Sequence, residues 1–332
     1  LSTSALRTRR SSQLSYCPGG ANIARIGQLC PVDGQRRSLG RPTRMDPITV
    51  RSFEGIFRRA LLPLHGEGEV RALTRAVFSG KLNIPVPALD PDRLLTPPEA
   101  QELSGILQRL VAGEPVQYVL GHVHFMGLRL AVDARVLIPR PETEELVDLI
   151  KHRIPYRPAC IVDVGTGSGC IALALKQAFP DAAVTGIDAS EGALDVARSN
   201  SKVNGLEVQW VQLDALGVEL MPFLHRQAQE APTLIVSNPP YVPLGDKASM
   251  QSQVLDHEPH LALFVDDGDP QRFYRAIARA AAGALQPGDE LWFEAHYLHA
   301  RESLAVVLAM GFAQGELIHD LSGNARFIRA RR

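Results

Sequence analysis

The residues with the clearest chemical potential are Ser-Asn-Pro-Pro-Tyr at 237–241, directly after an apolar run that predicts a buried strand. Pro239 restricts Asn238 to extended backbone angles, Pro240 does the same to Pro239, and neither proline carries an N–H group. The corner therefore presents acceptors. The Asn238 side-chain oxygen and the Pro239 carbonyl can each accept one hydrogen of a planar NH₂ group, while the Tyr241 ring packs over its face.

A planar NH₂ group is a poor nucleophile because its lone pair is delocalised. Two acceptors on its hydrogens favour a tetrahedral nitrogen and orient its lone pair for in-line attack. No catalytic base is needed, since the proton can leave after the transfer. The corner therefore predicts group transfer to an amide or aromatic amine. Asn238, Pro239 and Tyr241 are the predicted catalytic residues, Pro240 joins them in binding the substrate, and a simple strand terminator is the alternative.

A second motif, VDVGTGSGCIALAL at 162–175, places a glycine-rich loop between a buried strand and an amphipathic helix. The missing side chains let a ligand approach the backbone closely, which predicts a bound cofactor of the nucleotide type. The predicted binding residues are Gly165, Thr166, Gly167, Ser168 and Gly169. The spacing G-x-G-x-G differs from the dinucleotide pattern G-x-G-x-x-G, so it does not specifically indicate a pyrophosphate. A tight strand-to-helix turn is the alternative.

Three acids are predicted to face the same pocket, each with a structural alternative. Asp188 lies 21 positions beyond Gly167 and closes the next strand, where a carboxylate can accept both ribose hydroxyls or cap a helix near Ser190. Asp214 ends a third strand and could accept from an adenine amino group or stabilise a turn. If the ligand is S-adenosylmethionine, Asp163 is expected to lie below its methionine end. The alternative is a structural role, in which the carboxylate is bonded to backbone amides. Three acids disfavour a phosphate-rich ligand and favour the cationic S-adenosylmethionine.

Strands and helices alternate after Pro158, which predicts an α/β fold with a mostly parallel sheet covered on both faces. The strand candidates are short apolar runs at 159–165, 183–188, 208–214, 233–238 and 290–295. Helical periodicity separates most of them, near 170–179, 190–203, 270–285 and 299–310. Because the motif residues follow strands, we expect them at one carboxyl edge, where open α/β sheets bind ligands.

The residues before this region predict helices and a hairpin. Apolar residues recur at helical spacing over 47–80, and Thr96 with Glu99 indicates an N-cap for a helix to about residue 112. Residues 123–140 alternate apolar and polar side chains, which predicts a β-hairpin followed by a helix from about residue 142. The expected division is a leader at 1–44, a helical substrate-recognition domain at 45–115, a hairpin connector at 116–141 and a catalytic domain at 142–332.

The charge of the chain is unevenly distributed. Residues 1–44 carry eight arginines and one acid, a net charge of +7, whereas the remaining 27 basic and 35 acidic residues give −8. We expect this leader to be disordered, either as translated upstream sequence before Met45 or as a mitochondrial targeting segment.

No apolar run approaches the roughly 18 residues of a membrane span. The four cysteines lack C-x-x-C spacing and are expected to be free thiols in a cytoplasmic protein without a metal site.

Together, VDVGTGSGCIALAL and VSNPPYV resemble the class I S-adenosylmethionine-dependent methyltransferases that act on planar nitrogens. FMGLRLAVDARVLIPRPETEELVDLI at 125–150 is similar to a segment of the HemK-type methyltransferases of peptide chain release factors. The resemblance implies a Rossmann-like, mostly parallel seven-stranded sheet with a small N-terminal helical domain. It implies methylation of the glutamine in the Gly-Gly-Gln loop of a release factor. It also implies that Phe125 borders the methionine moiety, unless it is plain core, and that Asn238 meets cofactor as well as substrate.

Other functions stay open at this point. A ribosomal-protein glutamine methyltransferase would share fold and chemistry, and a DNA adenine N6-methyltransferase could use the same corner. The charge of −8 over residues 45–332 and the lack of a basic stripe weigh against DNA. A non-enzymatic binding module would not need the paired acceptors at Asn238. We expect a monomer that binds release factors and neither nucleic acid nor membrane.

Overall fold

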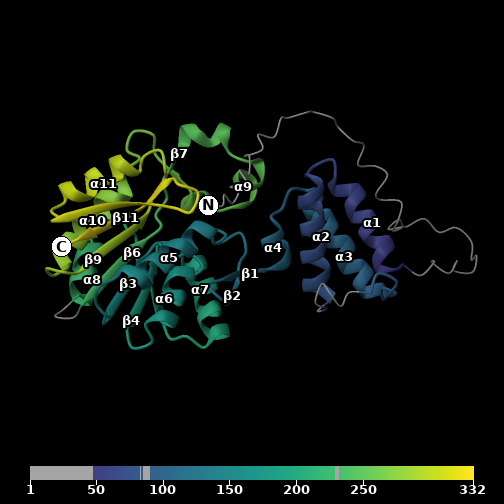
Figure 1. Ribbon diagram of the computed structural model, residues 1–332, viewed down its shortest axis with the longest axis horizontal. Helices are drawn as coiled ribbons and strands as arrows, with labels where there is room; N and C mark the ends of the chain where they lie inside the picture. Colours follow the sequence, from purple (N-terminus) through teal and green to yellow (C-terminus); the bar gives the residue numbers. More distant parts are fainter. Residues whose placement is uncertain (1–47, 83, 85–89, 229–231) are drawn as a thin grey trace, which may run out of the picture. The chain divides into compact units, whose positions relative to one another are not determined.

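The computed structural model, drawn in Figure 1, describes residues 48–82, 84, 90–228 and 232–332. The predicted leader, with Cys17 and Cys30, lies outside the described residues. The helices are α1 (Val50–Leu61), α2 (Glu67–Leu82), α3 (Pro97–Val111), α4 (Val116–Leu120), α5 (Pro141–Arg153), α6 (Cys170–Ala178), α7 (Glu191–Asn204), α8 (Leu220–Gln227), α9 (Ser252–His257), α10 (Arg272–Ala284) and α11 (Ala300–Ala309). The strands are β1 (His122–Phe125), β2 (Leu128–Ala131), β3 (Cys160–Val164), β4 (Ala183–Asp188), β5 (Gln209–Gln212), β6 (Thr233–Ser237), β7 (Val242–Pro243), β8 (Phe264–Val265), β9 (Glu290–Glu294), β10 (Gln314–His319) and β11 (Ala325–Arg331).

Seven strands form the central sheet in the order β10-β11-β9-β6-β3-β4-β5. The five strands from β9 to β5 in this order pair in parallel, whereas β11 is antiparallel to both of its neighbours. The order reverses at β3, which pairs with β4 on one side and β6 on the other. This topology confirms the predicted mostly parallel, seven-stranded α/β fold.

Successive residues of the central strands face two separate apolar layers, as the two-residue period of a strand requires. On one face, Ile161 and Val184 pack with side chains of α5 and α6. On the other, Val162 and Ile187 pack with α8, α10 and α11, and Figure 1 shows helices on both faces of the sheet. Strands buried on both faces are mostly apolar runs, which is why strands such as β3 and β6 were predictable.

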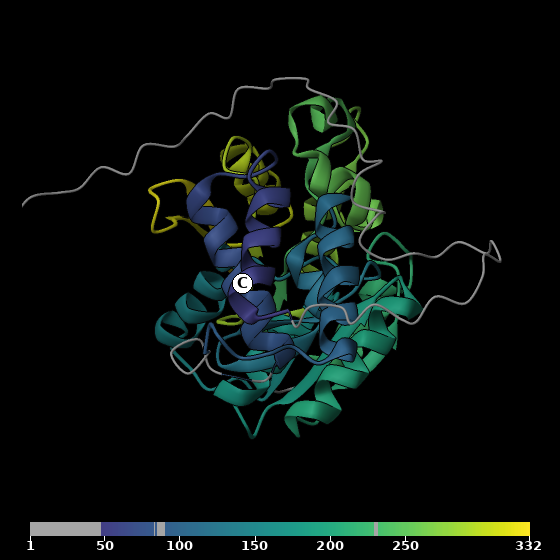
Figure 2. The same ribbon diagram turned by 90° about the vertical axis from the view of Figure 1, so that its right-hand side faces the viewer.

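The helices α1, α2 and α3 pack on one another around an apolar core of their own (Figure 2). Phe53, Phe57 and Phe78 meet there, with ring centroids 5.2 to 6.3 Å apart. The predicted start of α3 is confirmed: the Thr96 hydroxyl accepts from the Glu99 amide, and the Glu99 carboxylate accepts from the Thr96 amide. These two bonds satisfy N–H groups that a helix start leaves free. The domain division at residues 115 and 141 stays a prediction.

The hairpin is present but shorter than the alternation over 123–140 indicated. β1 and β2 span residues 122 to 131 and turn at Met126 and Gly127, both with positive φ. The residues that follow are not in a strand, and α5 begins at Pro141. In the parts of the chain that the structure describes, no helix is long and apolar enough to cross a membrane.

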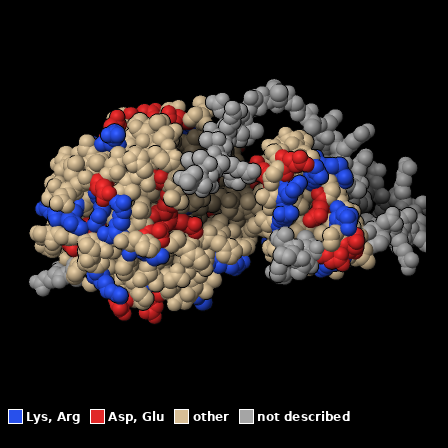
Figure 3. Space-filling view, viewed as in Figure 1, with Lys and Arg blue, Asp and Glu red and all other residues tan. Residues whose placement is uncertain are grey.

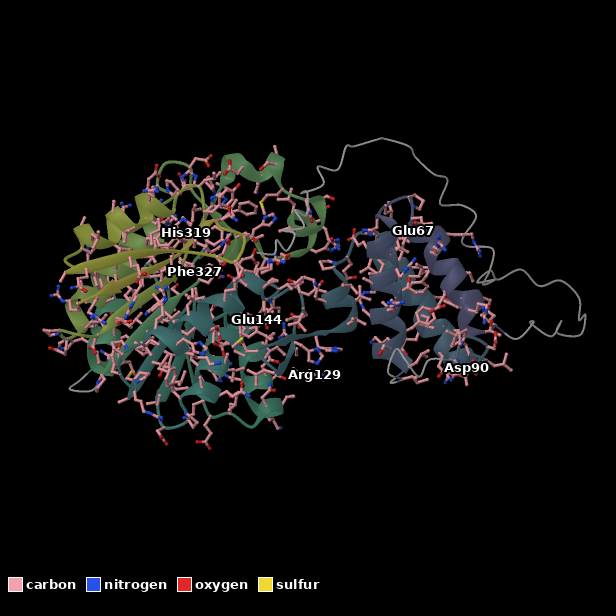
Figure 4. All side chains as sticks on the ribbon, in the orientation of Figure 1. Glu67, Asp90, Arg129, Glu144, His319 and Phe327 are labelled. Carbon is pink, nitrogen blue, oxygen red and sulfur yellow. The ribbon has the colours of Figure 1, made fainter. Side chains whose placement is uncertain are left out.

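The antiparallel strands β10 and β11 were not predicted from the sequence. Helix α8 was not predicted either. β11 carries Arg329 and Arg331, whose guanidinium groups bind the carboxylate of the fully buried Glu290 on β9. These charges interrupt the apolar pattern that marks the other strands. Figure 4 labels Phe327 of β11, which is buried and pairs with Ile318 of the neighbouring strand.

Candidate active site

The reversal point of the sheet brings the glycine loop and the Asn-Pro-Pro-Tyr corner together. Val164 of β3 pairs with Ser237 of β6 at the carboxyl ends of these parallel neighbours. The Ser237 hydroxyl donates to the Val164 carbonyl at 2.6 Å. Gly165 and Asn238 therefore leave the sheet side by side, at the edge where open α/β sheets bind ligands. The expected meeting of the two motifs at one edge is confirmed.

The glycine loop adopts a backbone that other residues rarely reach. Gly165, Gly167 and Gly169 have φ values of 75°, 54° and 80°, in the left-handed region that favours glycine. The amides of Gly165 and Thr166 both donate to the Ile187 carbonyl at 2.9 Å, which ties the loop to the end of β4. The glycine conformations and these two hydrogen bonds together fix the path of the loop.

Trp210 of β5 lies directly against this loop. A Cβ added to Gly169 would lie 2.8 Å from the Trp210 ring, and one added to Gly186 would lie 2.3 Å from it. Both glycines thus leave the space that the indole fills. Trp210 was not singled out from the sequence, because no local pattern links a tryptophan on the third parallel strand to glycines on other elements.

Gly186→Ala should lower the free energy of unfolding by roughly 1–3 kcal/mol, because the added methyl group overlaps the Trp210 ring. The added Cβ would also lie 2.8 Å from the Thr166 hydroxyl oxygen and would therefore disturb the glycine loop. Denaturant unfolding followed by far-UV circular dichroism measures the change. Gly105→Ala in α3 is the matched control: no atom lies within 4 Å of the added Cβ, so stability should rise by roughly 0.4–1 kcal/mol. Wild-type stability of Gly186→Ala would contradict this packing role.

Asp188 ends β4 with its carboxylate against the glycine loop. One oxygen accepts from the Gly167 amide at 2.9 Å and the other from the Ser190 amide at 2.9 Å. The N-cap of α7 is Ser190, whose hydroxyl accepts from the Ala193 amide, so Asp188 is not the cap. Burial raises the pKa of Asp188. Each of its oxygens retains a lone pair that could accept a ribose hydroxyl, and this role stays a prediction.

Asp214 follows β5 and is exposed. Its carboxylate accepts from the Leu216 amide at 2.9 Å, and its carbonyl accepts from the Gly217 amide at 2.9 Å. These are the contacts of the turn residue that was the alternative at this position. Contact with adenine stays a prediction.

Asp163 is a fully buried acid on β3. Its Oδ2 accepts from the Thr166 hydroxyl at 2.6 Å and from the Ala172 amide at 3.2 Å, while its Oδ1 has no partner among the described residues. Burial raises its pKa to about 7. A cationic group beside Oδ1 would supply the missing partner and favour the ionised carboxylate. The ammonium group of S-adenosylmethionine has this charge, so the acid fits the predicted cofactor.

Asn238 follows β6 and is held by side chains of two other elements. Its Nδ2 donates to Thr143 Oγ1 at 3.3 Å, and the Thr143 hydroxyl donates to Glu294 Oε2 at 2.7 Å. Thr143 lies in the first turn of α5 and Glu294 ends β9, and both are buried. Because the amide nitrogen faces Thr143, the other branch of the amide, Oδ1, is left as the acceptor.

The other residues of the corner, together with neighbouring aromatic rings, form an apolar and aromatic surface beside Asn238. Pro239 is buried, whereas Pro240 and Tyr241 are half-buried. The Tyr241 ring lies 5.8 Å from the His296 ring, which stacks on Tyr297 at 5.0 Å between centroids. Burial raises the pKa of the Tyr241 hydroxyl, so this side chain is a neutral phenol at physiological pH. Its packing over a substrate amide stays a prediction.

The hairpin approaches the site through polar contacts. Phe125 at the end of β1 is buried in the sheet's apolar core, and contact with the methionine moiety stays a prediction. The next residue is Met126, whose backbone amide donates to the Glu144 carboxylate at 2.7 Å (Glu144 is labelled in Figure 4).

Buried Asn200 on α7 accepts from the Ala131 amide at 2.6 Å and donates to the Ser168 carbonyl at 2.9 Å. Asn200 thereby links hairpin and glycine loop, and sequence reasoning missed it.

The segment that follows helix α9 (Ser252–His257) contacts the residues before α5. Its buried Glu258 binds the Arg140 guanidinium at 2.6 Å and accepts from the Ile138 amide at 3.2 Å. The carboxylate therefore fixes the residues that lead into α5. In the described ranges there is no group of three or more His, Cys, Asp or Glu side chains that could hold a metal ion.

Comparisons with known proteins match both parts of the chain. A family model for a methyltransferase domain matches residues 161–237, and one for a PrmC N-terminal domain matches residues 86–121. A release factor glutamine methyltransferase from Bacteroides thetaiotaomicron is 38% identical over 279 residues, covering 83% of this chain and 97% of that protein. The chain belongs to the release factor glutamine methyltransferase family. It is therefore an S-adenosylmethionine-dependent methyltransferase, and the resemblance inferred from the sequence is confirmed.

Further relatives carry the same name. The proteins from Flavobacterium psychrophilum and Bradyrhizobium diazoefficiens are 34% and 35% identical and cover 85% and 88% of this chain. The match extends over 99% and 98% of those relatives. Among solved structures, a methyltransferase from Pyrococcus furiosus is 16% identical with a TM-score of 0.44, covering 69% of this chain and 98% of that one.

Proposed function

We propose that this member of the release factor glutamine methyltransferase family methylates the side-chain amide nitrogen of the glutamine in the Gly-Gly-Gln loop of a peptide chain release factor. The observation that carries the proposal is the orientation of Asn238, whose Nδ2 is engaged by Thr143 while Oδ1 remains as an acceptor. Together with the Pro239 carbonyl it makes a site for an NH₂ group. The name shared by the relatives supports the same substrate.

Different residues of the chain would bind the cofactor and the substrate. The glycine loop, Asp188 and Asp163 would hold the cofactor, with Asp214 and Phe125 at its two ends. When bound, the cofactor supplies an electrophilic methyl group on a sulfonium sulfur. Asn238 Oδ1 and the Pro239 carbonyl accept the two amide hydrogens of glutamine and direct the nitrogen lone pair. The amide proton is lost after the transfer, so no side chain has to act as a base.

Mass spectrometry of a release factor after incubation with the enzyme and S-adenosylmethionine tests this function. The peptide that contains Gly-Gly-Gln should gain one methyl group, located on the glutamine by fragmentation. A release factor with glutamate in place of this glutamine is the control, because it lacks the NH₂ group. Methylation of duplex DNA or of a ribosomal protein in place of the release factor would contradict the proposal.

The distribution of charge supports a protein substrate. On the face shown in Figure 3, acidic and basic side chains are interspersed over the sheet-containing part of the chain. Duplex DNA binding would require several phosphate contacts from Lys and Arg on one surface. We also propose that the enzyme is cytoplasmic, because release factors act in translation, and that it is a monomer without direct contact with nucleic acid.

A further inference from the structure

We propose that Thr143 and Glu294 are positioning residues that determine which end of the Asn238 amide faces the substrate. The three side chains form a chain of two hydrogen bonds, from Asn238 Nδ2 to Thr143 Oγ1 and from the Thr143 hydroxyl to Glu294 Oε2. We call this chain the Glu294–Thr143–Asn238 relay. The inference rests on the proposed function, because it assigns the outward oxygen of Asn238 to the glutamine amide.

The direction of the relay follows from the number of hydrogens available. An ionised carboxylate accepts only, so Glu294 takes the single hydroxyl hydrogen of Thr143. Thr143 Oγ1 can then only accept, and Asn238 must turn its NH₂ branch toward it. The opposite orientation would bring two oxygens together without a hydrogen between them and would leave the hydroxyl oxygen unsatisfied. Glu294 does not bond to Asn238 directly. Through Thr143 it nevertheless selects one of the two orientations of the Asn238 amide, which have nearly the same shape.

Thr143 and Glu294 are buried and come from distant parts of the sequence. Thr143 is 2% exposed and Glu294 is 1% exposed, so water does not compete for these groups. Burial raises the pKa of Glu294 to about 7. The neighbouring charges are mixed: Arg326 and Arg140 lower this pKa and Glu142 raises it, while Tyr274 donates to the backbone carbonyl of Glu294 and leaves the carboxylate to Thr143.

The orientation matters for the type of group that the corner accepts. With Oδ1 outward, Asn238 and the Pro239 carbonyl offer two acceptors, which match the two hydrogens of an amide NH₂. With Nδ2 outward, the corner would offer one donor and one acceptor, and one glutamine hydrogen would lose its partner. Thr143 and Glu294 therefore favour the primary amide without touching it.

Three threonine variants test the relay. Thr143→Val removes the hydroxyl at nearly constant shape and should lower kcat for glutamine methylation roughly 5- to 10-fold, the value of one hydrogen bond, with the cofactor Kd unchanged. Thr143→Ser restores the hydroxyl and should recover most of kcat even where the lost methyl group lowers the melting temperature. Thr185→Val is the matched control, since Thr185 is equally buried at 2% on β4, and its kcat should equal that of wild type.

A packing role predicts a different ranking. If Thr143 only filled space, Thr143→Val would keep wild-type kcat and Thr143→Ser would be the impaired variant. That result in an enzyme that methylates Gly-Gly-Gln would overturn the relay and leave the proposed function standing. A wild-type enzyme that does not methylate this glutamine would instead overturn the proposed function.

The pH profile gives a second, independent readout. As the pH falls, Glu294 gains a proton and becomes a donor, which frees the Thr143 hydrogen to bond to Asn238 and removes the preference for Oδ1 outward. At saturating cofactor, wild-type kcat should therefore decline on the acid side. Glu294→Gln, whose NH₂ can donate to Thr143, should have a low kcat and no such decline. An unchanged acid limb in Glu294→Gln would contradict the relay even if the Thr143 variants fold poorly.

Discussion

Replacing Asn238 with alanine should lower kcat for methyl transfer to a release factor by roughly 10²-fold or more, because one of two preorganised acceptors is lost. These acceptors act mainly when the nitrogen becomes tetrahedral, so the effect should fall on kcat rather than on substrate KM. The cofactor Kd should change little, since the glycine loop and Asp188 keep their contacts. Single-turnover kinetics with labelled cofactor and calorimetry of cofactor binding measure the two quantities.

Asn204→Ala is the control for this experiment. Asn204 is half-buried like Asn238, and its side chain donates to the Arg129 and Asn200 carbonyls, so its loss costs comparable hydrogen bonds on α7. Its kcat per folded enzyme should stay within about twofold of wild type, since its hydrogen bonds are to the hairpin and to α7 and not to the corner. Unchanged turnover of Asn238→Ala would show that the acceptor pair does not stabilise the transition state.

The parallel strands, the glycine loop and the corner could be predicted because local rules govern each of them. Strands β3 and β6 are buried over their whole length and mostly apolar, since helices cover both of their faces. The glycines and prolines mark their own backbone conformations. The reversal of strand order then places Gly165 beside Asn238, a consequence of topology that the alternation of strands and helices already indicates.

The supporting side chains could not be predicted in the same way, because their partners are set by the fold. Thr143 and Glu294 are 151 positions apart, and Asn200 lies 69 positions from Ala131. Glu294 lies at the end of an apolar strand, where a buried acid is the one available signal. Such residues become recognisable only after strands β6 and β9 and the start of α5 are placed together.

Asp188→Ala should weaken binding of S-adenosylmethionine by roughly 1.5 to 3 kcal/mol, or about 10- to 150-fold in Kd, because hydrogen bonds to a charged acceptor are lost. Part of the effect comes from the glycine loop, since Asp188 also accepts from the Gly167 amide at 2.9 Å. Isothermal titration calorimetry measures the affinity. Asp195→Ala on α7, where the side chain is exposed and pairs with Arg198, should bind the cofactor with wild-type affinity.

A cofactor analogue that lacks both ribose hydroxyls separates the two parts of the Asp188 effect. Loss of the hydroxyls should weaken binding to the wild-type enzyme much more than binding to Asp188→Ala, because only the carboxylate can accept from them. The difference between the two losses is the coupling energy of the carboxylate with the ribose. If the analogue loses equal affinity in both proteins, Asp188 acts only through the loop and does not contact the ribose. Wild-type affinity of Asp188→Ala for the natural cofactor would remove the residue from the site altogether.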